Sequence, residues 1–73
     1  MIKSVKKISG DFMVHSDQGV ALVPKDTAIG ILRFHGVSEK DIACLFFDLR
    51  YAPQDAQAIF GINGSYICVK EVA

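Results

Sequence analysis

The sequence predicts an α+β fold: a small antiparallel sheet, made of an N-terminal meander and a C-terminal strand, with two or three short helices packed on one face. Three observations support it. Turn residues divide residues 1–24 into short apolar runs, residues 38–52 have a helical apolar pattern, and residues 65–72 alternate as a strand does. With 73 residues and no repeat or low-complexity tract, residues 1–73 are expected to form a single compact domain.

The first part of the chain predicts three strands. The runs IKSVKKI, FMVH and VALV are separated by Ser9-Gly10-Asp11 and by SDQG, and Pro24 follows the last run. Gly10 and Gly19 provide the backbone freedom that tight turns need. Apolar residues alternate in the second and third runs as in half-buried strands, at Phe12, Val14, Val20 and Leu22. These signals together predict an antiparallel meander.

The charge pattern does not favour nucleic acid as a partner. Eight Lys and Arg residues balance eight Asp and Glu residues, so the chain has no net positive field to attract phosphate backbones. The one local imbalance is Lys3, Lys6 and Lys7. We interpret these lysines as charges that protect a solvated edge strand from pairing with neighbours, in preference to a phosphate-binding arm.

Residues 27–35 form an ambiguous stretch. Their apolar residues fit a short helix and a buried strand almost equally, and Gly30 argues against a helix. Asp26 or Thr27 is a candidate N-cap, and Gly36 is a candidate helix stop. We favour the helix and keep the strand as the alternative.

Residues 38–52 predict the clearest helix. Ser38 is a suitable N-cap, and Glu39 and Asp41 bring negative charge to the first turn, where the helix dipole favours it. One apolar stripe on the helical wheel is expected to dock on the sheet. This stripe consists of Ile42, Leu45, Phe46 and Leu49.

The segment after Pro53 has two interpretations. Proline is tolerated at a first helical position, so PQDAQAIFG is a candidate third helix that stops at Gly61. Alternatively, the Asn-Gly pair at 63–64 predicts a hairpin in which residues 59–62 pair with residues 65–72. A closing strand over residues 65–72 is expected in either case.

No motif predicts a catalytic, cofactor-binding or metal site. The candidate ligands His15, His35, Cys44 and Cys68 include no pair at the close spacing of structural zinc sites. Both cysteines lie inside regular elements with no evident stabilisation of a thiolate, so we expect them to be reduced, buried and inert. The glycines match neither the dinucleotide fingerprint nor the Walker pattern. We therefore expect no enzyme, no cofactor and no small-molecule substrate, with a small cysteine enzyme as the third hypothesis.

The 38–52 helix also carries a second apolar stripe, centred roughly 100° to 200° around the wheel from the first. It consists of Ala43, Cys44, Phe47 and Tyr51. One interpretation is that the segment after Pro53, or the edge of the N-terminal sheet, covers it as ordinary core. The other is that it stays open and meets another chain, with Phe47 and Tyr51 as aromatic anchors. We favour the second, because leaving large apolar side chains in water costs a small fold stability.

The functional hypothesis is a small non-enzymatic protein–protein interaction or regulatory module, which acts by occupying a surface through the 43–51 face. A second copy is the simplest partner, so a homodimer is expected, and a different protein is the other candidate. The chain has no apolar run of signal-peptide or membrane-spanning length, so we expect a cytoplasmic protein.

The alternative function is a winged-helix-like DNA-binding regulator. In that hypothesis residues 27–35 and 38–52 form the helix pair, and residues 62–69 form the wing. The residues that would face the DNA offer no Arg, Asn or Gln for base edges and bring acidic groups toward phosphates. For this reason the protein-binding hypothesis is preferred.

Overall fold

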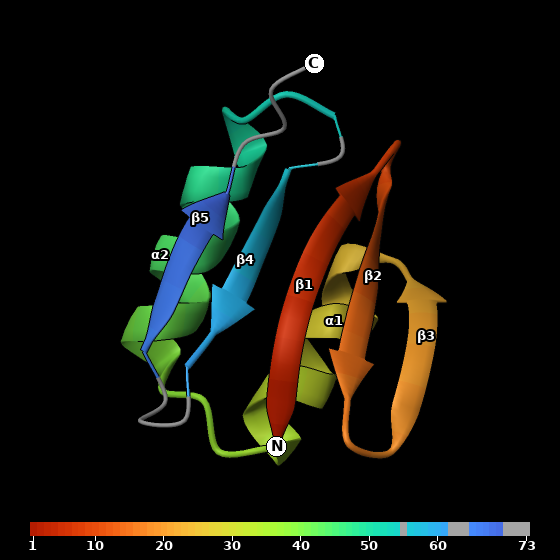
Figure 1. The fold of residues 1–73 in the computed structure, drawn as a ribbon, viewed down its shortest axis with the longest axis vertical. Helices are drawn as coiled ribbons and strands as arrows, with labels where there is room; N and C mark the ends of the chain where they lie inside the picture. Colours follow the sequence, from red (N-terminus) through yellow and green to blue (C-terminus); the bar gives the residue numbers. More distant parts are fainter. Residues whose placement is uncertain (55, 62–64, 70–73) are drawn as a thin grey trace.

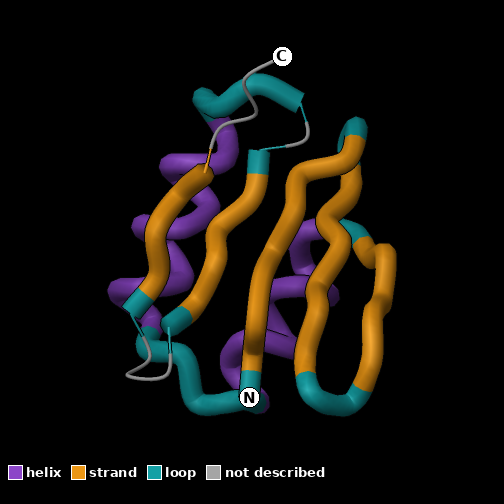
Figure 2. The backbone as a smooth tube through the Cα atoms, in the orientation of Figure 1, coloured by secondary structure: helices purple, strands orange, loops and turns teal. Residues whose placement is uncertain are grey.

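The structure is a computed structural model that describes residues 1–54, 56–61 and 65–69, without the side chains of residues 68 and 69. Within these residues the chain forms five strands and two helices (Figures 1 and 2). In chain order they are β1 (Ile2–Ile8), β2 (Asp11–Ser16), β3 (Gly19–Val23), α1 (Lys25–Phe34), α2 (Glu39–Arg50), β4 (Gln57–Phe60) and β5 (Tyr66–Val69).

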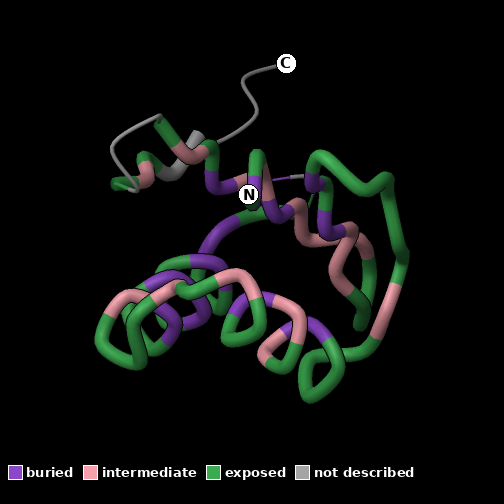
Figure 3. Tube along the Cα trace, turned by 90° about the horizontal axis from the view of Figure 1, so that it is seen from below, coloured by how far each residue is buried: buried purple, intermediate pink, exposed green. Residues whose placement is uncertain are grey.

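The strands form one antiparallel sheet in the order β3-β2-β1-β4-β5. Both helices lie on the same face of this sheet: Figure 1 shows α1 behind β1 and β2, and α2 behind β4 and β5. The predicted α+β class, with its meander, closing strand and helices on one face, is confirmed, with two helices in the described part of the chain. No described element covers the other face of the sheet, which we call the open face (Figure 3).

The meander forms where the turn residues predict it. β1 pairs with β2, and β2 pairs with β3, each through a short turn. In the first turn the left-handed residue is Ser9, at φ 53°, and not Gly10. Gly19 has a φ of 126° at the start of β3, a conformation that favours glycine.

The interpretation of Lys3, Lys6 and Lys7 as guards of an edge strand is wrong, because β1 is the central strand of the sheet. Lys7 points toward the helix layer instead. Its Nζ donates hydrogen bonds to the backbone oxygens of Arg50 (3.2 Å) and Ala52 (2.9 Å). The last carbonyls of a helix have no partner inside the helix, and a cation beside them also interacts favourably with the helix dipole. Lys7 therefore caps the C-terminal end of α2 from the middle of the sheet.

The favoured interpretation of residues 27–35 as a helix is confirmed. α1 begins earlier than predicted: Pro24 is the N-cap residue and makes no side-chain cap, so neither Asp26 nor Thr27 has that role. Gly36 follows the helix with a φ of 84°, which a residue with a side chain rarely adopts. The helix therefore ends where the glycine predicts.

α2 has the boundaries and the cap that the sequence predicts. The Oγ of Ser38 accepts a hydrogen bond from the backbone N–H of Asp41 (3.1 Å), which satisfies one of the unpaired donors of the first turn. The stripe predicted to dock on the sheet is buried. Its ring, Phe46, packs edge-on against Phe12 of β2, with 4.9 Å between ring centres.

The core lies in a single layer between the sheet and the helices (Figure 3). Neither described helix combines the length and apolar character needed to cross a membrane. Buried core residues come from nearly every described element: Ile2, Val5, Val14, Ala28, Leu32, Ile42, Leu45, Phe46, Leu49, Ala52, Ala56 and Ala58.

The hairpin interpretation of the segment after Pro53 is confirmed, and the third helix does not form there. β4 pairs with β5 through Phe60↔Tyr66, and on its other side it pairs with β1 through Ser4↔Ile59. The pairing of β4 with β1 explains why a strand forms here. A helix at this point would leave the backbone groups on that side of β1 unpaired. The loop at 62–64 lies outside the described residues.

The cap made by Lys7 can be tested with Lys7→Met. Methionine keeps an apolar stem and removes both hydrogen bonds, so we expect the free energy of unfolding to fall by about 1 to 2 kcal/mol. Lys3→Met is the matched control, because Lys3 lies on the same strand and is exposed. Urea denaturation measures both variants, and equal losses would contradict the cap.

Gly30 offers a stabilising substitution. It lies inside α1, it has no positive φ, and a Cβ built on it meets no atom within 4 Å. Because glycine in a helix is about 1 kcal/mol less favourable than alanine, we expect Gly30→Ala to raise the free energy of unfolding by about 0.5 to 1 kcal/mol. Gly36→Ala should lower it, because of the positive φ. If both variants melt at lower temperature than the parent, the account of Gly30 is wrong.

Candidate functional site

The second apolar stripe of α2 lies at the protein surface. α2 turns its first stripe into the core, so the residues on the other side of the helix point away from the sheet. Phe47 is 64% exposed and Tyr51 is 69% exposed, which are large fractions for aromatic side chains. All four residues of the stripe are exposed: Ala43, Cys44, Phe47 and Tyr51.

The two aromatic residues of the stripe support each other. Their rings meet edge to face, with 5.2 Å between the centres and an angle of 61° between the planes. The guanidinium of Arg50 lies 5.6 Å from the ring centre of Tyr51. Contacts of these kinds each contribute about 0.5 to 1 kcal/mol at exposed positions. The rings are therefore partly ordered in advance, which lowers the entropy cost of binding a partner.

The part of the chain that the structure describes does not cover this stripe. The segment after Pro53 leads into β4 on the sheet, and the N-terminal strands lie in the same sheet. Neither of the two elements that were candidates to bury the stripe lies over it, since its aromatic residues stay exposed. An uncharged surface with two aromatic rings is thus presented to solvent.

Cys44 is an exposed, free thiol, so the prediction of a buried cysteine is wrong for this residue. The cause is its place on the outer side of α2, one turn before Phe47. It lies in the middle of the helix, with Asp41 and Asp48 about one turn away on either side. The side chain of Cys68 lies outside the described residues.

One ion pair, between Arg33 and Glu39, lies at the junction of the two helices. Among the described residues, no group of three or more His, Cys, Asp or Glu side chains could hold a metal ion. Nε and Nη2 of Arg33 donate to the two carboxylate oxygens of Glu39, each at 2.7 Å. This contact lowers the pKa of Glu39 and raises that of Arg33, and it joins the end of α1 to the start of α2.

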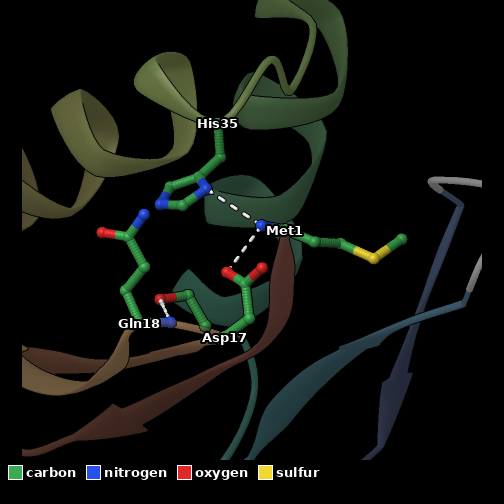
Figure 4. A network of polar contacts seen from close by, with 5 residues as sticks. Met1, Asp17, Gln18 and His35 are labelled. Carbon is green, nitrogen blue, oxygen red and sulfur yellow. Dashed lines mark hydrogen bonds and ion pairs between the residues drawn. The ribbon is translucent and has the colours of Figure 1, made fainter.

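A second polar network holds the β2–β3 turn against the end of α1 (Figure 4). The amine of Met1 donates to Oδ1 of Asp17 (2.8 Å) and lies 3.2 Å from Nδ1 of His35. The hydrogen bond from this amine lowers the pKa of the Asp17 carboxyl. Within the turn, Oγ of Ser16 accepts a hydrogen bond from the backbone N–H of Gln18 (3.2 Å). These polar groups all take part in contacts that join parts of the fold.

Tyr66 links β5 to α2. Its hydroxyl donates to Oδ2 of Asp48 (3.1 Å), one residue along the helix from Phe47. Partial burial, together with the adjacent Asp48 carboxylate, raises the pKa of Tyr66 well above its ordinary value. The contact fixes the outer side of α2 relative to the edge of the sheet.

Sequence reasoning missed one concave feature, a pocket of about 530 Å³ between α1 and the β2–β3 hairpin. The prediction that β3 is half-buried at Val20 and Leu22 is also wrong, because these residues are 57% and 55% exposed. They share the open face with Met13 and His15, to which they pair. The sequence signal that could have pointed to this exposed strand is the run VALV itself, which contains no charged residue.

The contact between Tyr66 and Asp48 predicts an effect of pH. Because the folded-state pKa of Tyr66 exceeds its ordinary value of 10.0, this contribution to stability is complete below that pH and is lost as pH rises above it. Asp48→Asn removes the negative neighbour, so we expect the ultraviolet titration of Tyr66 to shift to lower pH. Asp26→Asn, on α1, is the control. An equal titration in both variants would contradict the assignment.

Two surface features therefore call for an explanation: the apolar stripe on α2 and the pocket beside β3. The elements that carry them, α2 and β3, lie on opposite sides of the central strand β1 (Figure 1). Comparison of the chain with protein-family models, with curated proteins and with solved structures finds no significant match.

Proposed function

We propose that this protein is a small protein–protein interaction module, without catalytic activity, that forms a homodimer through the outer stripe of α2. The observation that carries the proposal is the exposure of Phe47 and Tyr51. Burying a phenylalanine side chain contributes about 2 kcal/mol, and a fold of this size has a small stability margin. An aromatic pair in water is best explained by a partner that covers it.

A second copy of the chain suits this stripe. A two-fold contact needs only one self-complementary patch, and the stripe carries no charge that dimerisation would bury unpaired. If two α2 helices pair antiparallel around Phe47, the two Phe47 rings meet at the axis and each Tyr51 faces the partner's Ala43. Arg50, Asp48 and Lys40 then lie at the polar rim.

The proposal includes a cytoplasmic location, because an exposed thiol such as Cys44 stays unpaired in a reducing compartment. A DNA-binding regulator remains the alternative function, since α1, α2 and the β4–β5 hairpin follow one another in the order that a winged helix requires. It has less support, because the outer side of α2 exposes a cysteine and two aromatic rings and its Glu39 carboxylate would face phosphates.

The homodimer is tested with Phe47→Lys. Lysine is accepted in the second half of a helix, so we expect a folded variant that sediments as a monomer at concentrations where the parent is a dimer. Ile67→Lys is the matched control: Ile67 is 67% exposed, on edge strand β5, and lies on the open face with Ile59. It should remain a dimer.

Circular dichroism shows whether each variant is folded. If the parent is a monomer throughout the micromolar range, or if both variants dissociate equally, the self-association is wrong. Alkylation of Cys44 gives a second measurement, because its rate should fall in the parent as the dimer forms. Salt-dependent retention of duplex DNA by the parent would favour the alternative function.

A further inference from the structure

β3 is an edge strand with an unprotected outer side. Its neighbour is β2 on one side, and no described strand lies on the other. In an antiparallel pair, alternate residues turn their backbone N–H and C=O groups away from the neighbour, so about half of the backbone groups of β3 are free for another strand. Another extended backbone can satisfy the whole row of these groups at once.

Proteins usually protect such an edge with lysine, proline or a bulge inside the strand. The five residues of β3 are Gly19, Val20, Ala21, Leu22 and Val23, and none of these devices occurs among them. The lysines that could have protected an edge lie in the central strand β1. The edge of β3 is therefore available for pairing.

The 530 Å³ pocket lies directly under this edge, on the helix side of the sheet. It exists because α1 buries Ala28 and Leu32 against the sheet under β2 and leaves β3 without a helix beneath it. Apolar side chains and two glycines form most of its walls, among them Val14, Ala21, Gly30, Ile31 and Phe34. Phe34 lines the pocket and is 81% exposed, the largest exposure among the large hydrophobic side chains described.

We propose that the β3 edge and this pocket form a binding site for an extended peptide segment of a partner protein, uncharged at its centre and with a large apolar side chain that enters the pocket. In this mode the peptide adds to the sheet as a further strand. Backbone hydrogen bonds to β3 provide affinity, and the pocket selects the side chain. The site goes beyond the proposed dimer and shares no residue with it.

The charge of the pocket lining and the size of the pocket determine which segment fits. Apart from His35, no side chain that lines the pocket is ionisable, and Nδ1 of His35 lies 3.2 Å from the amine of Met1. A charged residue in the centre of the peptide would lose its hydration without gaining a partner. The β3 strand of a second copy would bring only Gly19, Ala21 and Val23 to the pocket side, which are too small to fill it.

The affinity expected is that of a transient interaction. A five-residue strand and one pocket offer less than the roughly 800 Å² per partner of a standard interface. Dissociation constants in the micromolar range or weaker are therefore expected.

The test uses synthetic peptides of the sequence TVTXTVT with blocked ends, in which X is Ala, Leu or Phe. Nuclear magnetic resonance titration of the full chain measures affinity, and amide hydrogen exchange locates the bound strand. We expect affinity to rise with the size of X, by about tenfold from Ala to Phe, and new protection of alternate amides in β3. Two further peptides carry N-methyl groups on one or the other alternate set of amides. One of them should fail to bind, because it cannot donate to β3.

Gly30→Leu places a side chain in the pocket without a clash at Cβ and with a better helix former, so it should fold and bind the X = Phe peptide about tenfold more weakly. Lys3→Leu adds the same side chain to an exposed position of β1 and should bind as the parent does.

Three results would overturn the proposal: no binding by any peptide at about 1 mM, equal binding of both N-methylated peptides, or protection outside β3. Protection of β3 that rises with protein concentration in the absence of peptide would identify a second copy as the occupant. Monomeric behaviour of the parent would leave this site unaffected, so the two proposals fail separately.

Discussion

The structure depends on the burial of one stripe of α2 against the centre of the sheet. Ile42, Leu45 and Leu49 are buried in the same layer as Val5 of the central strand β1 and Ala58 of its neighbour β4. A chain of this length can build two layers and one interface between them. Within the described residues, the outer sides of both layers are consequently left without a partner, and the large exposed apolar side chains lie there or at the layers' margins.

Polar contacts at both ends of α2 hold that helix in position on the sheet. Ser38 satisfies the first turn, and Lys7 satisfies the last carbonyls. The ion pair of Arg33 with Glu39 fixes the junction with α1, and Tyr66 holds Asp48 on the side of β5. A helix held at four points loses little further freedom when a partner docks, so its outer stripe is a pre-organised surface.

The sequence predicts the elements whose signals are local. The Ser38 cap, the stripe of α2 and the turns of the meander each depend on residues within a few positions of one another, and all lie where predicted. The outer stripe of α2 could be located on the helical wheel for the same reason. The alternation of apolar residues in β3 predicts a half-buried strand. It carries no information on whether another element of the fold covers those side chains.

What could not be predicted depends on pairing between distant segments. The order of the strands decides that Lys7 lies beside α2 and not on an edge. The same order decides that the segment after Pro53 is a strand, because both a helix and a hairpin satisfy its local pattern. The pocket under β3 forms because the sheet extends beyond the helix that covers it. The width of the sheet depends on pairing between strands, so no short stretch of sequence predicts the pocket.

The central position of β1 has a consequence for biosynthesis. A ribosome releases the meander first, and β1 then has β2 on one side and nothing on the other until the residues of β4 emerge. During that interval the strand that will be the most sheltered in the finished protein is a bare edge, open to misfolding with neighbouring nascent chains.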